Sequence, residues 1–200
     1  MNKIFFVDNI IDLVCLIPVL IGILMYISGQ VRARKNNNKP EKKDTNHNYA
    51  ILIPARDESK VIEGLLKSIK EQSMKINMND VYVIVEDKND KTVQIANTYN
   101  ATIIVRKHLE LKRKGYALDE AIKEIIANNK KYDAYFIFDA DNILDKDYLK
   151  NMTETYDLGY DIGIGYRNCK NGNDNVIAAS SALTFSMINT LSNEMKKLRT

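Results

Sequence analysis

An apolar run that ends in two aspartates separated by one alanine limits which folds this chain can adopt. The run extends from Tyr135 to Phe138, and Asp139 and Asp141 follow it. A continuous apolar run of this kind is typical of a strand buried in a parallel sheet. Open α/β sheets bind ligands at the carboxyl ends of their strands, so two carboxylates there predict a Mg²⁺ or Mn²⁺ ion that carries a diphosphate. The alternative is that the aspartates only open a loop or cap the next helix.

Three other apolar stretches, at residues 49–54, 81–85 and 101–105, alternate with segments of helical spacing at 61–69, 92–99 and 115–127. This alternation predicts an α/β fold, a mostly parallel sheet with helices on both faces. We also expect a strand over 161–168 and a long helix over 175–198. The four strands at 49–138 should bring the charged loops 55–60, 86–91, 106–114 and 139–145 to one edge of the sheet. The chain has no glycine-rich dinucleotide turn and no P-loop, which argues against dinucleotide enzymes and P-loop kinases.

The amino-terminal segment is apolar and carries no charge from Leu13 to Ile27. Residues 1–29 are therefore expected to form a transmembrane anchor, since residues 4–28 could span a bilayer core of roughly 30 Å. A cleaved signal peptide is the alternative, but no small-residue cleavage site follows Ser28. Residues 30–48 form a polar linker with many basic residues, whereas Lys3 is the one basic residue in the sequence before the apolar run. This asymmetry predicts a single-pass protein of the plasma membrane whose working domain is cytoplasmic.

The linker is rich in asparagine and has no aromatic residue before residue 49, so it does not predict a nucleic-acid surface. The two cysteines, Cys15 and Cys169, form neither a disulfide framework nor a zinc motif. We therefore expect no nucleic-acid partner, and the basic stretch suits contact with the membrane surface.

Four motifs occur in order at the expected sheet edge. They are Ile51-Leu52-Ile53-Pro54-Ala55-Arg56-Asp57-Glu58, Val85-Glu86-Asp87 with Asp90 and Thr92, Lys114-Gly115-Tyr116-Ala117-Leu118, and Phe138-Asp139-Ala140-Asp141. Together they resemble family 2 glycosyltransferases, which have the Rossmann-like GT-A fold, over residues 49–191. The resemblance implies inverting transfer of a sugar from a nucleotide sugar, usually a UDP-sugar, to a polysaccharide or lipid-linked acceptor at the cytoplasmic membrane face.

The resemblance also implies roles for individual residues. Asp141 of the DXD motif would bind Mg²⁺ or Mn²⁺, and Asp139 would share the ion or reach the ribose. Glu86 would accept a hydrogen bond from the base, and Lys114 would meet a phosphate or sugar oxygen. Residues that would shape the nucleoside pocket are Pro54, Ala55 and Glu58. Two alternatives stay open: Glu58 caps the first helix, and Lys114 is a solvated charge.

An inverting transfer needs a general base near the acceptor hydroxyl. The acidic residues after Asn142 do not lie in the family's motif for that base, so we expect the base beyond Thr200. The GT-A domain of residues 49–200 is then truncated, without its acceptor half. Two other hypotheses remain: a catalytically incomplete nucleotide-binding or scaffold module, and a metal-dependent phosphotransferase or nucleotidyltransferase.

Overall fold

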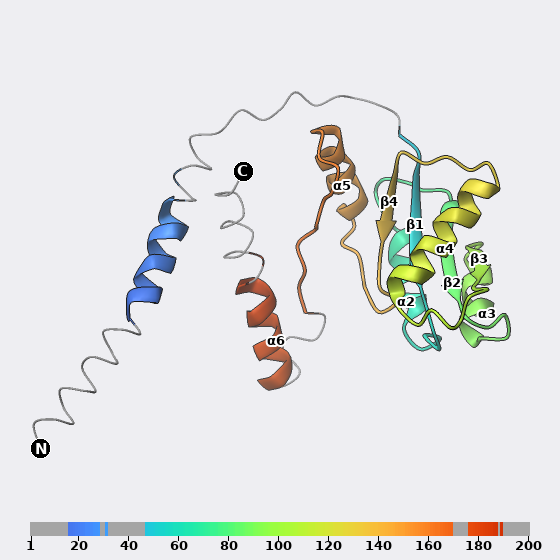
Figure 1. The fold of residues 1–200 in the computed structure, drawn as a ribbon, viewed down its shortest axis with the longest axis horizontal. Helices are drawn as coiled ribbons and strands as arrows, with labels where there is room; N and C mark the ends of the chain where they lie inside the picture. Colours follow the sequence, from blue (N-terminus) through green and yellow to red (C-terminus); the bar gives the residue numbers. More distant parts are fainter. Residues whose placement is uncertain (1–15, 29–30, 32–46, 170–175, 188, 190–200) are drawn as a thin grey trace, which may run out of the picture. The chain divides into compact units, whose positions relative to one another are not determined.

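The computed structural model describes residues 16–28, 31, 47–169, 176–187 and 189 (Figure 1). It divides into two compact units, residues 42–163 and residues 1–41 with 164–200. Every residue predicted for the ligand site lies in the unit of residues 42–163. Each unit is described by itself below.

A four-stranded sheet forms the centre of the unit of residues 42–163. Its strands are β1 (Tyr49–Pro54), β2 (Val81–Val85), β3 (Thr102–Val105) and β4 (Ala134–Ile137), in the order β3-β2-β1-β4. All three strand pairs are parallel, with Leu52 of β1 facing Tyr82 of β2 and Ile137 of β4. The predicted parallel sheet is confirmed, and the strand bounds differ from the predicted ones by one residue at most.

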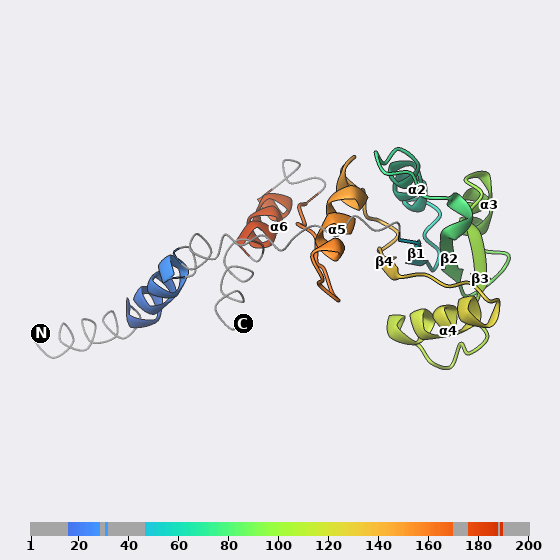
Figure 2. The same cartoon turned by 90° about the horizontal axis from the view of Figure 1, so that it is seen from above.

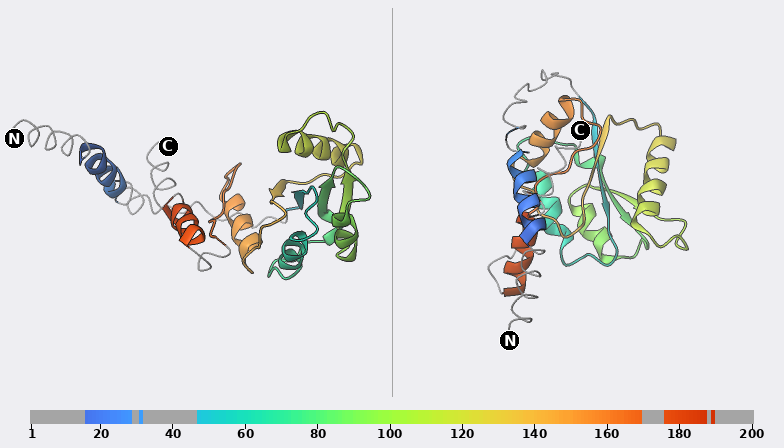
Figure 3. Two further views of the ribbon diagram at one scale, coloured as in Figure 1. Left: turned by 90° about the horizontal axis from the view of Figure 1, so that it is seen from below. Right: turned by 60° about the vertical axis from the view of Figure 1, so that its left-hand side comes forward.

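Helices cover both faces of this sheet, as Figure 2 shows: α2 (Ile62–Lys70) and α3 (Lys91–Thr98) lie on one side and α4 (Lys114–Ala127) on the other. The strands supply each face with alternate residues because successive side chains point to opposite sides. Ile51 and Ile53 pack in the cluster of α2 and α3, whereas Ala50 and Leu52 pack with Ala117 and other residues of α4. The same layers are visible from other directions in Figure 3.

Two further elements of this unit had no counterpart in the predictions, the short helix η1 (Met78–Asp80) and the helix α5 (Tyr148–Asp157). Leu149 of α5 is fully buried in the core cluster of α2 and α3. Its position shows that α5 is held by tertiary packing.

The strand expected over 161–168 is not present, because the backbone there has neither strand nor helix geometry. The segment contains Gly163 and Gly165, one on each side of Ile164. Glycine weakens a strand because its backbone loses more conformational entropy on folding than that of other residues and because it offers no side chain to pack.

The helix expected over 175–198 is observed as α6 (Val176–Met187), and residues 188 and 190–200 lie outside the described residues. At the amino-terminal end, residues 16–28 are helical. The rest of the predicted anchor and most of the linker lie outside the described residues. Within the part of the chain that the structure describes, no helix has the length and apolarity needed to cross a membrane.

Candidate functional site

The carboxyl ends of the four parallel strands bring charged side chains to one edge of the sheet. Arg56 follows β1, Glu86 follows β2, Arg106 follows β3 and Asp139 follows β4. Backbone bonds extend the pairing just beyond the strands: Ala55 N donates to Ile84 O at 2.8 Å, and Arg106 N donates to Val85 O at 2.9 Å. The loops therefore leave the sheet from fixed starting points.

Asp139 and Asp141 carry exposed carboxylates directly after β4. Asp139 Oδ1 forms an ion pair with Lys114 Nζ at the first residue of α4. Asp141 Oδ1 accepts an N–H from the side chain of Asn142 at 3.3 Å. Neither aspartate caps a helix, since the N-cap of α5 is Asp147. Their carboxylates remain available to a ligand.

The loop that carries the two aspartates is fastened to α2 by a buried glutamine. Gln72 has no exposed surface, and its Nε2 donates to Ser68 O at 3.1 Å and to Asp145 O at 2.6 Å. Its Oε1 accepts from Leu149 N at 2.9 Å. Ser68 Oγ adds a bond from Leu144 N at 3.1 Å. These bonds fix the end of the loop just before α5 begins.

The loop after β1 is shaped by the start of α3. Asp90 is the N-cap of α3, and its carboxylate accepts from Thr92 N at 2.8 Å and from Asp57 N at 2.9 Å. The second bond supports Asp57, whose φ of 56° lies in the left-handed region. Burial would raise the pKa of the Asp90 carboxyl, but the bonds from Thr92 and Asp57 outweigh it and lower that pKa below its usual value. Asp90 is therefore a structural residue of this edge.

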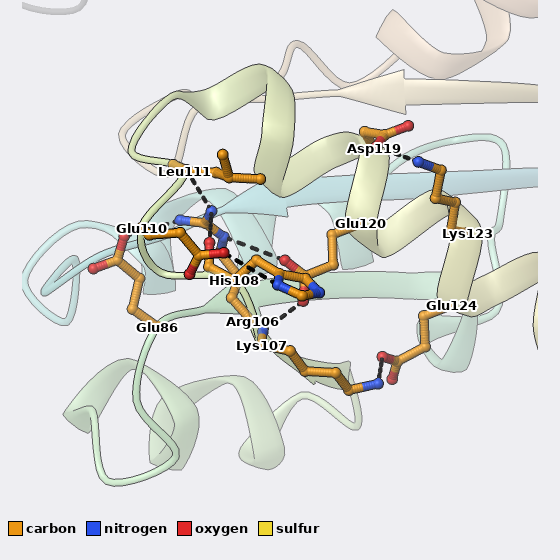
Figure 4. Close-up of polar contacts among 10 residues, drawn as sticks. All are labelled: Glu86, Arg106, Lys107, His108, Glu110, Leu111, Asp119, Glu120, Lys123 and Glu124. Carbon is orange, nitrogen blue, oxygen red and sulfur yellow. Dashed lines mark hydrogen bonds and ion pairs between the residues drawn. The ribbon is translucent and has the colours of Figure 1, made fainter.

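Glu86 lies between two arginines. Its Oε1 accepts from Arg106 Nη1 at 3.1 Å, and its Oε2 lies 3.3 Å from Arg56 Nε. The Arg106 side chain is 5% exposed, and its Nη2 also donates to the carbonyl oxygens of His108 and Leu111 at 3.0 and 2.7 Å. Figure 4 shows this guanidinium between Glu86 and the loop before α4. Arg106 thus joins the ends of β2 and β3 to the loop that leads to Lys114.

The Arg106 guanidinium is incompletely paired on its other side. Arg106 Nε and Glu120 Oε2 lie 3.9 Å apart, and neither atom has a hydrogen-bond partner. Outward from this cluster, Lys107 pairs with Glu124 at 2.8 Å on the surface of α4. Arg106 is therefore the buried cation between Glu86 and Glu120, a role that was not predicted from the sequence.

The predicted site residues form two groups in the structure. Lys114, whose side chain is 45% exposed, forms an ion pair with Asp139. Glu86 contacts the two arginines. Glu58 does not cap α2 through its side chain, because the N-cap is Val61 without a side-chain bond; the Glu58 carbonyl oxygen accepts from the Val61 and Ile62 N–H groups instead.

The remaining predicted residues line the start of the β1 loop, where Pro54 ends β1 and Ala55 is buried. Within the described residues, no hydrogen bond or ion pair joins Glu86 and its two arginines to Asp139, Asp141 or Lys114. A shallow pocket elsewhere includes none of the predicted site residues; it is lined by Tyr49, β4 and parts of α5 and the segment after it.

A divalent cation fits the chemistry of Asp139 and Asp141, although these carboxylates alone do not complete its coordination. In the parts of the chain that the structure describes, no three His, Cys, Asp or Glu side chains are placed to hold a metal ion. Mg²⁺ and similar ions are commonly bound by one or two carboxylates together with water and substrate phosphates. Two exposed carboxylates beside a lysine match that partial donor set.

Comparisons with known proteins agree with this architecture. The model of the family described as "Glycosyl transferase family 2" matches residues 50–199. The 4,4'-diaponeurosporenoate glycosyltransferase of Staphylococcus haemolyticus is 32% identical over 87 residues, which are 44% of this chain and 22% of that protein. The protein of the same name from Staphylococcus aureus strain USA300 is 31% identical over 90 residues, 44% of this chain and 23% of that protein. The matches thus span about a quarter or less of these relatives.

Among solved structures, the mannosyltransferase PcManGT from Pyrobaculum calidifontis superposes with a TM-score of 0.53 at 18% identity. The match covers 76% of this chain and 44% of that one. At this level of identity the comparison concerns the fold, and it shows an α/β architecture like that of PcManGT.

Proposed function

The chain belongs to glycosyl transferase family 2, and from this premise we propose that it binds a nucleotide sugar, with UDP as the expected nucleotide, at the carboxyl edge of its sheet. The observation that carries the proposal is the pairing of Asp139 with Lys114 beside Asp141 at the end of β4. Two carboxylates and an ammonium group at one place suit a cation and the phosphate oxygens that it binds. The PcManGT structure contains GDP-Man and Mn²⁺, which is consistent with the proposal.

Each group has a chemical role in this proposal. Asp141 and Asp139 would hold Mg²⁺ or Mn²⁺, which acts as a Lewis acid on the charge that develops on the departing diphosphate. Lys114 would exchange its bond with Asp139 for a phosphate or sugar oxygen. Glu86 would accept an N–H from the nucleobase, and the β1 loop at Pro54, Ala55 and Glu58 would surround the nucleoside. Because these groups are fixed to strand ends, the site would be largely preorganised.

The acceptor is proposed more broadly, as a polysaccharide or a lipid-linked glycan at the cytoplasmic face of the plasma membrane. The curated relatives are named as glycosyltransferases of 4,4'-diaponeurosporenoate, which supports glycosyl transfer as the reaction class. The basic linker after the apolar segment supports a membrane-anchored protein with its sheet domain in the cytoplasm. Helical residues 16–28 expose large apolar side chains such as Leu24, which suits an apolar environment.

A titration of the full chain with UDP tests the donor site. We expect Mn²⁺ to strengthen UDP binding, measured by calorimetry, and Asp139→Asn or Asp141→Asn to remove most of that metal-dependent gain. The matched control is Asp119→Asn, because Asp119 has the same 58% side-chain exposure as Asp139 and also pairs with a lysine, Lys123. This control should bind UDP as the unmodified chain does.

The outcomes separate the hypotheses. If UDP and GDP do not bind with or without Mn²⁺, or if both variants bind as the control does, the donor-site proposal is wrong. UDP binding that depends neither on Mn²⁺ nor on the two aspartates would support the nucleotide-binding module, and Mn²⁺-dependent release of inorganic phosphate from UDP would support phosphotransfer.

A further inference from the structure

Glu86 is held by two arginines that differ greatly in burial. The Arg106 side chain is 5% exposed, whereas the Arg56 side chain is 73% exposed. Each arginine contacts a different carboxylate oxygen, Arg106 at Oε1 and Arg56 at Oε2. The two oxygens of Glu86 are therefore not equivalent toward a ligand.

The contact at Oε1 is fixed. Arg106 Nη1 donates to it at 3.1 Å, and the same guanidinium is tied by Nη2 to two backbone carbonyl oxygens. Separating a buried charge from its partner costs several kcal/mol, because the charge has no water to replace that partner. A ligand cannot easily displace Arg106, so Oε1 is not available to it.

The contact at Oε2 can be exchanged. Arg56 Nε lies 3.3 Å from this oxygen, and an exposed ion pair of this kind contributes only about 0–1 kcal/mol. The backbone on each side of Arg56 is anchored, since Ala55 N donates to Ile84 O and Asp57 N donates to Asp90 Oδ2. Only the Arg56 side chain needs to move to free Oε2.

We propose that Arg56 sets the nucleobase affinity of the site by occupying Glu86 Oε2 in the free chain, so that a base binds by exchanging its ring N–H for the guanidinium. This inference rests on the proposed function of Glu86 as the base contact. The ligand class is a base with a ring N–H, such as uracil, which offers one N–H to the one exchangeable oxygen. Arg56 is a residue that competes with the ligand rather than one that holds it.

Uridine tests this proposal because it carries the base without phosphate charge. Removal of the competitor by Arg56→Ala should strengthen uridine binding by about two- to fivefold, the range expected for loss of an exposed ion pair. Added salt weakens an exposed ion pair. Uridine binding to the unmodified chain should therefore be stronger at high NaCl than at low NaCl, and uridine binding to Arg56→Ala should be the same at both concentrations. Both affinities are measured by NMR titration of the full chain.

The control is Lys60→Ala, which removes one positive charge from the same exposed loop without a contact to Glu86. It should leave uridine binding and its salt dependence unchanged. Glu86→Gln in the Arg56→Ala background should remove the gain, because Arg106 would retain the single amide oxygen and an NH2 group, which donates, would stand in the place of Oε2.

Unchanged or weaker uridine binding by Arg56→Ala would overturn the proposal, as would a gain of the same size in Lys60→Ala. Absence of uridine binding in a chain that still binds UDP with Mn²⁺ would overturn it too, while leaving the donor-site proposal intact. If UDP with Mn²⁺ also fails to bind, the proposed function itself is wrong.

Discussion

Replacement of Gln72 tests whether the loop that carries the two aspartates is held by tertiary hydrogen bonds. The variant Gln72→Leu keeps a side chain of similar size, so it should leave no large cavity. It removes the bonds to Ser68 O, Asp145 O and Leu149 N. The Ser68 carbonyl and the Leu149 N–H then lose their side-chain partner, and both of these bonds are buried. The Asp145 carbonyl still accepts from Tyr148 N at 3.0 Å.

The magnitude follows from these two backbone groups. Each buried group left without a partner costs about 1–3 kcal/mol. Burial of the leucine in place of an amide offsets about 1–2 kcal/mol. We therefore expect the free energy of unfolding to fall by about 2–4 kcal/mol, a large part of the roughly 5–15 kcal/mol that stabilises a typical protein.

Urea denaturation of the full chain measures this loss from the shift of the midpoint at constant slope. Glu71→Leu is the control, because Glu71 directly precedes Gln72, its side chain is 65% exposed and its Oε1 lies 4.0 Å from Lys67 Nζ. It should change the free energy of unfolding by less than about 0.5 kcal/mol. The amide hydrogen of Leu149 should also exchange faster in Gln72→Leu. A loss for Gln72→Leu no larger than that of Glu71→Leu would refute the reasoning.

The other predictions concern three single side chains. Asp90→Ala should lower the free energy of unfolding by about 1 kcal/mol at pH 7, because it removes the N-cap of α3. Since the pKa of Asp90 is lowered in the folded state, the difference from the unmodified chain should shrink as the pH falls through that pKa. A difference in urea midpoints that does not change with pH would contradict this. Tyr132→Phe removes the 2.5 Å bond to Asp80 Oδ1 and should cost about 1–2 kcal/mol in the same assay, whereas no loss would show that this bond adds nothing. In spectrophotometric titration, burial and Asp80 should keep Tyr132 protonated above pH 10, since both raise its pKa. Lys114→Ala should weaken UDP binding by about tenfold, while Lys112→Ala should not; equal effects would indicate a general charge effect.

The sheet could be predicted from sequence because its strands are short apolar runs set between helices of clear amphipathic spacing. The run at Val81–Val85 is buried at every position, as a central parallel strand requires. The helix α5 could not be predicted in the same way, since most of its residues are polar. Its place depends on Leu149 in the core and on the bond that Leu149 N donates to Gln72 Oε1, two contacts between segments far apart in the chain.

The position of the two aspartates was also predictable, because a strand end determines where the next residues emerge. The arrangement around Glu86 was not, since it needs three loops from β1, β2 and β3 to meet. One signal was present in the sequence: Arg106 follows the apolar strand at Val105 directly, where a buried arginine requires a carboxylate partner. The identity of that partner depends on which strands are neighbours, and this is a property of the sheet order.

The burial of Arg106 also constrains the substitution history of this edge. Loss of Glu86 alone would leave a buried guanidinium without its main counterion, and loss of Arg106 alone would take from Glu86 its buried partner and from the Leu111 carbonyl its side-chain donor. Either single step leaves one charged group without its partner, whereas joint replacement by apolar residues removes both charges together. Positions 86 and 106 should therefore covary among homologous chains, changing together or not at all.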